Sequence, residues 1–138
     1  MSHGDFYYRP VLIPNTILGS SSFNICDVTV SPFIQDHGYT STVGYRFGSF
    51  AYSTDVLRLD EAAFAILDGI TDWVVDCVRL EPHPVHSHLN NTLEWIERVK
   101  PVRAWLTHMN NTLDYDSLLS VLPPGVRPAH DGLVIEIP

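Results

Sequence analysis

The sequence has no long apolar run and no surplus of basic residues. A membrane-spanning helix needs about 18 or more apolar residues in succession, and the 138 residues contain no such run. The chain has 8 Lys and Arg against 16 Asp and Glu, which gives a net charge of −8. Binding to the phosphate backbone of nucleic acids needs a basic face. We therefore expect neither a membrane protein nor a general nucleic-acid binder.

Cysteine is scarce, and the start of the chain lacks a targeting pattern. The two cysteines, Cys26 and Cys77, are far apart and lie in apolar, strand-like surroundings. This favours buried, reduced thiols over a disulfide framework. The first ten residues show no basic region followed by an apolar one, so we expect no signal peptide. Together these features predict a cytoplasmic protein.

Short catalytic motifs are also missing: the chain has no HExxH, no paired CxxC, no glycine-rich phosphate loop and no GxSxG. Histidine is unusually frequent, because its seven residues nearly equal the 8 Lys and Arg. The acidic balance does not exclude a small anionic substrate, because a bound metal ion can supply positive charge locally. At this length the chain can form one domain.

The first half of the chain has the pattern of β-strands. Residues 23–30 alternate and are β-rich, residues 31–38 form a short extended piece, and residues 42–55 predict a hairpin that turns near Gly48 and Ser49. Strands joined by such short connections pair antiparallel. We therefore expect an antiparallel meander.

Helices and strands alternate in the second half. Helices are expected at 59–69, with Asp60 as N-cap and Gly69 as stop, at 87–101, with Ser87 as cap and Pro101 as stop, and at 114–125, ended by Pro123; strands are expected at 71–80, 102–108 and 132–138. The predicted fold class is α/β (α+β), with one mostly antiparallel or mixed sheet and helices on one face.

Four ionisable residues come at the ends of predicted strands: His37, Asp55, Asp76 and His108. If these ends share one edge of the sheet, two imidazoles and up to two carboxylates meet there. Such a mixture of ligands suits Zn²⁺, Mn²⁺ or Fe²⁺. Simpler readings remain open, because Asp55 could be a turn former and Asp76 could order backbone or another side chain.

A second group of histidines lies in a proline-containing loop before a predicted helix. The run "EPHPVHSH" holds His83, His86 and His88. It is either a solvated loop or a loop in which one imidazole is functional. The residues by themselves leave both readings open.

Several segments together resemble the C-terminal half of a metallo-β-lactamase-fold hydrolase. They are "PFIQDHG" (32–38), "GYRFGSFAYSTD" (44–55), "VVDCVRLEPHPVHSHLNNTLEWIE" (74–97), "LTHMNNTLDYDSLLSVLP" (106–123) and "AHDGLVIEI" (129–137). They are most similar to the branch that includes the phosphoribosyl cyclic phosphodiesterases and is related to the tRNA 3′-processing endonucleases. The resemblance extends over nearly all of residues 30–138. It implies half of an αββα sandwich.

The resemblance also implies roles for individual residues. His37, Asp55 and His108 match metal ligands of a site that holds two divalent ions, Zn or Mn, with Asp55 as the bridging, catalytic carboxylate. His86 matches a histidine that faces the substrate phosphate and protonates the leaving oxygen. The ions would lower the pKa of a bound water and clamp phosphoryl oxygens. The implied substrate is a small phosphodiester, cyclic or nucleotide-like.

The chain departs from the family because it has no His-x-His-x-Asp-His. That cluster supplies four of the family's seven ligands from the N-terminal half, so the resemblance implies one partial domain over 1–138, with 1–29 as its start, and partial or no metal occupancy. We expect a homo-oligomer or pairing with a missing N-terminal half, since an uncovered sheet face would expose apolar surface. His130, where the family often has an aromatic residue, is assigned no role.

Two other functions remain open at this point. The chain could be a catalytically silent module that self-associates through the fold, with its site residues as relics. It could also be a small acidic binding domain unrelated to the family, which a structure with His37, Asp55 and His108 far apart would favour.

Overall fold

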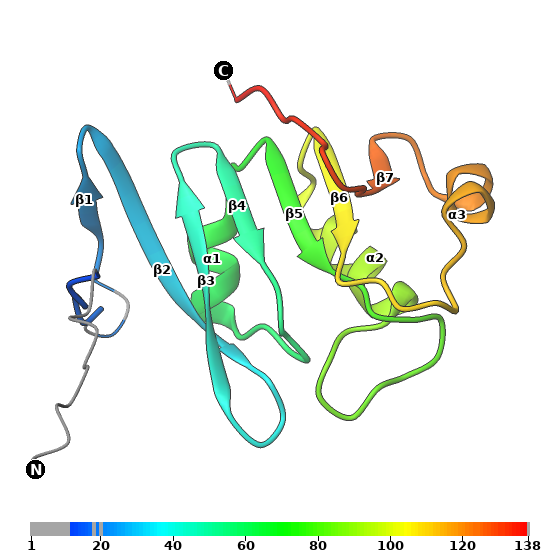
Figure 1. The fold of residues 1–138 in the computed structure, drawn as a ribbon, viewed down its shortest axis with the longest axis horizontal. Coiled ribbons are helices and arrows are strands. Elements are labelled where there is room, and N and C mark those ends of the chain that lie inside the picture. The colour runs from blue at the N-terminus through cyan, green and yellow to red at the C-terminus, as the bar shows by residue number, and fades with distance from the viewer. Residues whose placement is uncertain (1–11, 18, 20, 138) are drawn as a thin grey trace, which may run out of the picture.

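The chain folds around one seven-stranded sheet whose strands follow each other in sequence order (Figure 1). The computed structural model describes residues 12–17, 19 and 21–137. The strands are β1 (Phe23–Ile25), β2 (Val28–Asp36), β3 (Ser41–Phe47), β4 (Phe50–Ser53), β5 (Asp72–Asp76), β6 (Arg103–Thr107) and β7 (Val126–Pro128).

The sheet is antiparallel in its first half and parallel in its second half. Strands β1 to β4 pair antiparallel, whereas β4–β5, β5–β6 and β6–β7 pair parallel. Two successive antiparallel pairings restore the strand direction, so β2 runs the same way as β4, β5 and β6. The C-terminal ends of these four strands therefore meet at one edge of the sheet, which is the lower edge in Figure 1.

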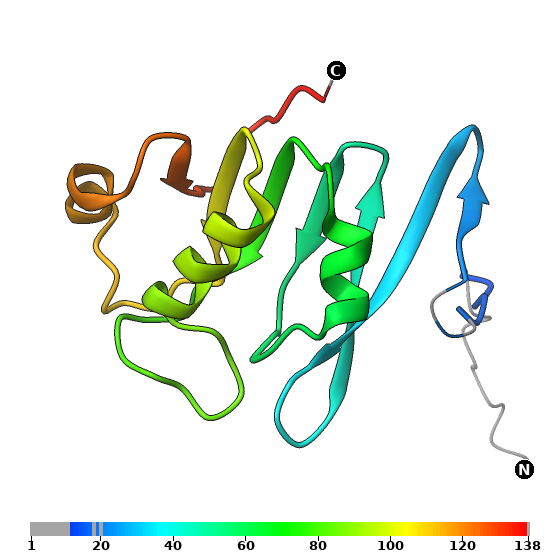
Figure 2. The ribbon, with the colours of Figure 1, turned by 180° about the vertical axis from the view of Figure 1, so that it is seen from behind.

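Three short helices connect the parallel strands: α1 (Glu61–Leu67), α2 (Leu89–Val99) and α3 (Tyr115–Val121). Asp60 and Asp114 cap α1 and α3 by accepting backbone N–H bonds, as expected of N-cap aspartates. Figure 2 shows α1 and α2 on the same face of the sheet. No helix among the described residues has the length and apolar character that crossing a membrane requires.

The hydrophobic core lies between the sheet and α1 and α2. Trp73, Val75 and Leu106 point from the parallel strands into this layer and are fully buried. Leu67 of α1 and Ile96 of α2 pack against them. Burying these large apolar side chains supplies the main driving force for folding. The predicted single sheet with helices on one face is confirmed.

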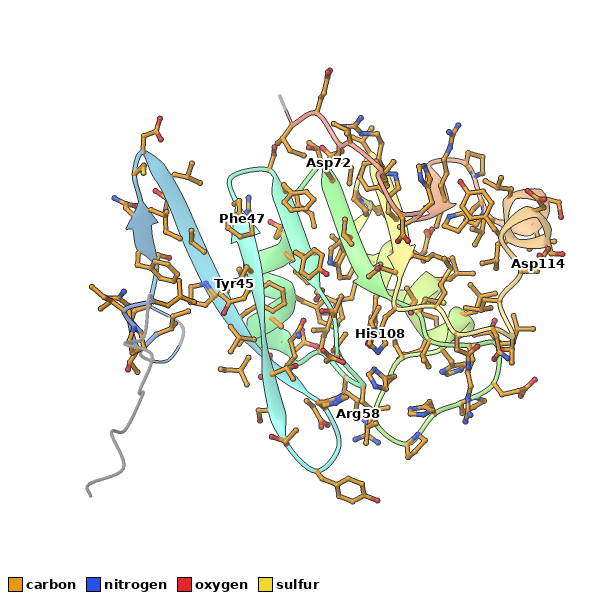
Figure 3. All side chains as sticks on the ribbon, viewed as in Figure 1. Tyr45, Phe47, Arg58, Asp72, His108 and Asp114 are labelled. Carbon is orange, nitrogen blue, oxygen red and sulfur yellow. The ribbon has the colours of Figure 1, made fainter. Side chains whose placement is uncertain are left out.

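The opposite face of the sheet carries apolar side chains that the helices do not cover. Tyr45 and Phe47 project from it toward the viewer in Figure 3. Tyr45 pairs in register with Tyr52, whose side chain remains 43% exposed. Ile34 of the neighbouring β2 is 46% exposed. The sheet therefore presents an apolar surface to solvent on this side, which we call the bare face.

The N-terminal hairpin and one cysteine differ from the sequence-based expectation. Residues 23–30 form two strands joined by a turn at Cys26 and Asp27, rather than a single strand. Cys26 has a φ of 54° and is exposed, because it occupies this turn. Only Cys77 is a buried thiol, and burial raises its pKa to about 12. Both cysteines are free.

Two other local predictions are wrong. Ser87 does not cap α2: His88 occupies the N-cap position, while Ser87 is buried and its hydroxyl donates to the carbonyl oxygen of Asp76. Residues 132–137 form no strand, and β7 is instead Val126–Pro128. Pro128, the last residue of β7, is tolerated because β7 is an edge strand of the sheet.

Candidate functional site

The four strand-end residues singled out from the sequence lie along one edge of the sheet. His37 directly follows β2, Asp55 follows β4 after one residue, Asp76 is the last residue of β5, and His108 directly follows β6. His108 lies at the lower end of β6 in Figure 3. The common strand direction explains this placement, since it brings these four ends to the same edge.

Three side chains at this edge are close enough to share a metal ion. Potential ligand atoms of His37, Asp55 and His86 all lie within 4.8 Å of one another. His108 adjoins the group, with its Nε2 3.6 Å from Asp55 Oδ1. The ring of His86 lies between the other two imidazoles, 4.6 Å from His37 and 4.7 Å from His108 between ring centroids. The structure thus brings together the predicted metal ligands and the predicted proton donor.

The protonation of His37 suits metal binding. Its Nδ1 is 2.6 Å from the carbonyl oxygen of Val85. A carbonyl oxygen can only accept, so Nδ1 carries the hydrogen and Nε2 keeps a free lone pair. Metal-ligating histidines commonly donate their second N–H in this way. With the Asp55 carboxylate, whose side chain is 46% exposed, this donor set fits a divalent cation.

His86 is held by a buried carboxylate. Its Nδ1 is 2.9 Å from Oδ2 of Asp76, a side chain with no exposed surface. The same oxygen accepts the N–H of Val56 at 3.0 Å. Burial raises the pKa of the Asp76 carboxyl, and the hydrogen bond from His86 works against that rise. Because an ionised carboxylate only accepts, His86 carries a hydrogen on Nδ1, and its Nε2 is the atom left for other chemistry.

The second oxygen of Asp76 is unusual. Oδ1 is buried and has no hydrogen-bond partner among the described residues. Buried polar atoms are normally paired, so this oxygen remains able to accept a hydrogen bond beside the cluster of imidazoles. The sequence-based reading that Asp76 orders backbone and another side chain agrees with its bonds to Val56 and His86.

Two of the site residues have left-handed backbone conformations. Asp55 has a φ of 55° and His108 a φ of 62°. Such conformations are uncommon outside glycine and cost free energy. They turn the chain sharply after β4 and β6. Asp55 therefore occupies a turn and also lies in the metal-sized group with His37 and His86.

The three histidines of the 83–88 loop have different roles. The Nδ1 of His83 faces the backbone N–H groups of Val85 and His86, at 3.4 and 3.2 Å, and burial lowers the pKa of its imidazole. His88 begins α2 without a side-chain cap bond. His86 alone joins His37 and Asp55 in the metal-sized group. Of the three, His86 is thus the imidazole whose position fits the expectation of a functional histidine in this loop.

The close approach of Gly38 to Val85 was not predicted from the sequence. A Cβ on Gly38 would lie 2.6 Å from Cγ1 of Val85, and Gly38 has a φ of 74°. Only glycine therefore lets the turn after His37 approach the Val85 backbone that orients the imidazole. A glycine directly after a strand-end histidine, in "QDHG", is the signal that marks such a close approach.

Comparison with known families finds one that covers most of the chain. Residues 12–109 match the family described as the beta-lactamase superfamily domain. The matched range includes His37, Asp55, His86 and His108. Among curated proteins, an octanoyltransferase of Porphyromonas gingivalis is 25% identical over 113 residues, which is 80% of this chain and 23% of that protein. The chain thus spans about a quarter of this relative.

Solved structures show the same architecture. A diphosphatase from the PhnP family superposes with a TM-score of 0.81 at 34% identity, over 84% of this chain and 46% of that one. The metallo-β-lactamase fold protein YhfI from Bacillus subtilis superposes with a TM-score of 0.73 at 14% identity, over 86% of this chain and 54% of that one. Zn²⁺-bound PqqB from Methylobacterium extorquens superposes with a TM-score of 0.71 at 19% identity, over 89% of this chain and 55% of that one. The chain spans about half the length of each.

Proposed function

The chain belongs to the β-lactamase superfamily and has the metallo-β-lactamase fold, and from that premise we propose that it is a metal-dependent hydrolase of phosphodiester bonds. The observation that carries the proposal is the meeting of His37, Asp55 and His86 within 4.8 Å at the sheet edge, beside His108. The similarity to a diphosphatase at 34% identity supports a phosphorus-containing substrate.

His37, Asp55 and His108 are the proposed metal ligands of this chain. The imidazoles offer neutral nitrogen donors, and Asp55 offers two oxygens, which suits Zn²⁺ or Mn²⁺. A bound divalent ion would supply Lewis-acid activation of water and stabilise charge on phosphoryl oxygens. The side chains of Asp55 and His108 are 46% and 42% exposed, so a substrate reaches them from solvent.

His86 is the proposed proton donor. Its Nδ1–H is held by Asp76, so Nε2 is the atom that delivers a proton to the departing oxygen of the substrate. The buried carboxylate holds the ring through this hydrogen bond. It also fixes the direction in which the ring presents Nε2. Imidazole is suited to this task because its ordinary pKa is near 6.5.

In our proposal, a second folded unit, which we call the second body, covers the bare face. The chain matches only 46–55% of the solved chains, so each of those folds contains about as much structure again. The exposed Tyr52 and Ile34 give the bare face the apolar character of an interface. We propose that a missing N-terminal half, or a second copy of this chain, packs there. A monomer at high concentration in analytical ultracentrifugation would contradict self-association.

The test combines metal analysis with turnover. Purified protein is supplied with Zn²⁺ or Mn²⁺, its bound metal is measured by mass spectrometry, and hydrolysis of bis(4-nitrophenyl) phosphate is followed. Asp55→Asn and His108→Ala should lose metal and turnover together. Asp27→Asn, which changes an exposed aspartate in the turn between β1 and β2, is the matched control and should retain both.

The other outcomes are equally informative. Bound metal without turnover would identify a metal-binding module whose hydrolytic activity requires the second body. Neither metal nor turnover would identify a catalytically silent module of the same fold and overturn the proposed function.

A further inference from the structure

We propose that Thr42 and Gln35 are positioning residues that hold the Asp55 carboxylate in the orientation needed to bind a metal ion. This inference rests on the proposed function, because it assigns Asp55 to the metal site. Neither residue touches the metal-sized group of side chains directly. Both act through the backbone of residues 54–55.

Gln35 is the buried centre of the arrangement. Its side chain has no exposed surface, although glutamine is normally a surface residue. Its Nε2 donates to Thr42 Oγ1 at 3.0 Å and to the Thr54 carbonyl oxygen at 2.9 Å. Its Oε1 accepts from the hydroxyl of Ser53, which is also fully buried. The amide is therefore satisfied at both ends, and it links β2 to β3 and to the end of β4.

Thr42 passes the constraint on to Asp55. Its hydroxyl accepts from the Gln35 amide, whose nitrogen can only donate, and therefore directs its own hydrogen to the Asp55 carbonyl oxygen at 2.7 Å. The carbonyls of two successive residues, Thr54 and Asp55, are thus held by one side-chain relay. This pairing fixes the chain where Asp55 takes its left-handed φ of 55°.

The other side of Asp55 is held independently. The N–H of Val56 donates to Asp76 Oδ2 at 3.0 Å, and the Val56 carbonyl oxygen accepts from the N–H of Ser87 at 2.6 Å. A left-handed residue is retained only where its surroundings determine its conformation. The relay supplies the constraint before Asp55, and Asp76 supplies the constraint after it.

The neighbouring strand leaves room for this relay. A Cβ on Gly44 would lie 2.6 Å from Oε1 of Gln35, and it would also overlap the ring of Phe33. Gly44 has no positive φ, so its backbone does not require glycine. Glycine in a strand interior is unfavourable for the strand itself. The space that it provides for the Gln35 amide accounts for its presence there.

The test compares two variants of Thr42. Thr42→Ser keeps the hydroxyl, whereas Thr42→Val keeps the shape and removes it. Valine favours strands at least as well as threonine does, so strand propensity does not explain a defect in Thr42→Val. The affinity for Zn²⁺ is measured by chelator competition, and the free energy of unfolding of the metal-free proteins is measured with urea.

We expect Thr42→Val to bind Zn²⁺ about 10- to 100-fold more weakly than the wild type, which is the usual effect of removing a partner behind a ligand. Thr42→Ser should bind nearly as tightly as the wild type. In metal-free protein, amide hydrogen exchange of residues 54–56 should be faster in Thr42→Val than in Thr42→Ser.

The outcomes separate this inference from the proposed function. If the wild type binds Zn²⁺ and Thr42→Val binds it equally well, the inference is overturned while the proposed function stands. If the wild type binds no metal, the proposed function fails and the inference fails with it. Equal amide hydrogen exchange of residues 54–56 in Thr42→Val and Thr42→Ser would also overturn the inference.

Discussion

Two stacked imidazoles of the site, His86 and His108, are held in opposite ways. The side chain of His86 is 12% exposed and hydrogen-bonded to a buried carboxylate, whereas that of His108 is 42% exposed. No hydrogen bond to the His108 ring is present among the described residues, and its position depends on a left-handed backbone and on stacking against His86. The His86 ring is therefore held by a buried side chain, whereas the His108 ring is placed by the backbone turn at His108 and by stacking.

This difference matches the two proposed tasks. A proton donor needs one nitrogen fixed so that the other is presented in a constant direction, and the Asp76 carboxylate supplies that constraint. A metal ligand obtains its final orientation from the ion, so a ring free to adjust by a small rotation is acceptable. We infer that anchoring, rather than proximity, separates the two roles.

The largest effect is expected from a change in the Asp76 carboxylate that holds His86, made with a side chain of the same shape. In Asp76→Asn the amide oxygen can replace Oδ2, which accepts from both the Val56 N–H and His86 Nδ1, but the negative charge behind the imidazole is lost. Hydrolysis of bis(4-nitrophenyl) phosphate should fall by about 10- to 100-fold, as for other partners behind functional groups. Stability should change little, since the hydrogen-bond count is retained.

Asp72→Asn provides the control for this substitution. Asp72 is a buried aspartate at the opposite end of the same strand, as Figure 3 shows, where it pairs with Arg103. Turnover by Asp72→Asn should match that of the wild type. Equal losses in the two variants would show that Asp76 acts only on the fold.

The same alanine substitution should affect the stability of the fold differently at the two histidines. His86→Ala leaves the buried Asp76 carboxylate with one donor fewer, which costs about 1–3 kcal/mol. His108→Ala removes a half-exposed ring without hydrogen bonds, and such changes are usually within about 0.5 kcal/mol. Urea unfolding of the metal-free proteins measures both values. Similar losses would mean that the core does not anchor His86 selectively.

A smaller effect is expected where His37 meets the 83–88 loop. Gly38→Ala combines a left-handed φ with a Cβ 2.6 Å from Val85, whereas Gly48→Ala has a similar φ of 59° and no atom within 4 Å. Both variants lose about 1 kcal/mol to backbone strain. Only Gly38→Ala should also weaken Zn²⁺ binding, because it displaces Val85, whose carbonyl oxygen orients His37. Equal Zn²⁺ affinities in the two variants would contradict this role.

The smallest effect concerns pH and the turn after β2. The Gly38 N–H and then the Arg58 guanidinium hold the pKa of Asp36 below its ordinary value of 3.8. The resulting stabilisation is present above that value and is lost as the pH falls through the lowered pKa. Asp36→Asn should therefore lose a little stability at neutral pH and none at low pH. Urea midpoints that fall equally at pH 7 and pH 2.5 would contradict this account.

Much of the fold followed from local sequence patterns. Asp60 and Asp114 begin helices at the predicted positions because a capping aspartate bonds only within its own turn. The antiparallel first half followed from short connections between strands, whereas the parallel pairing of β4 to β7 was expected only as part of a mostly antiparallel or mixed sheet. The prediction of a strand at 132–138 was wrong because alternating apolar and polar residues also occur in half-buried segments that are not paired. Which segment pairs with β6 depends on where the chain meets that strand.

The site was predictable only in part, for a similar reason. The strand ends at His37, Asp55 and His108 were visible as apolar runs stopping at ionisable residues. The residues by themselves did not show which histidine of the 83–88 loop faces them, since that depends on Asp76 ten residues earlier in the chain, and only the family resemblance pointed to His86. The relay from Gln35 to Asp55 joins residues from separate strands and left no local pattern.

The sequence by itself placed two imidazoles and two carboxylates at the ends of predicted strands, because strand ends and helix caps are set by neighbouring residues. Only the tertiary structure decided which of these groups are anchored, through contacts such as that between His37 and Val85, 48 residues apart. The reason is physical: a hydrogen bond fixes an imidazole only when folding has excluded water from its partner.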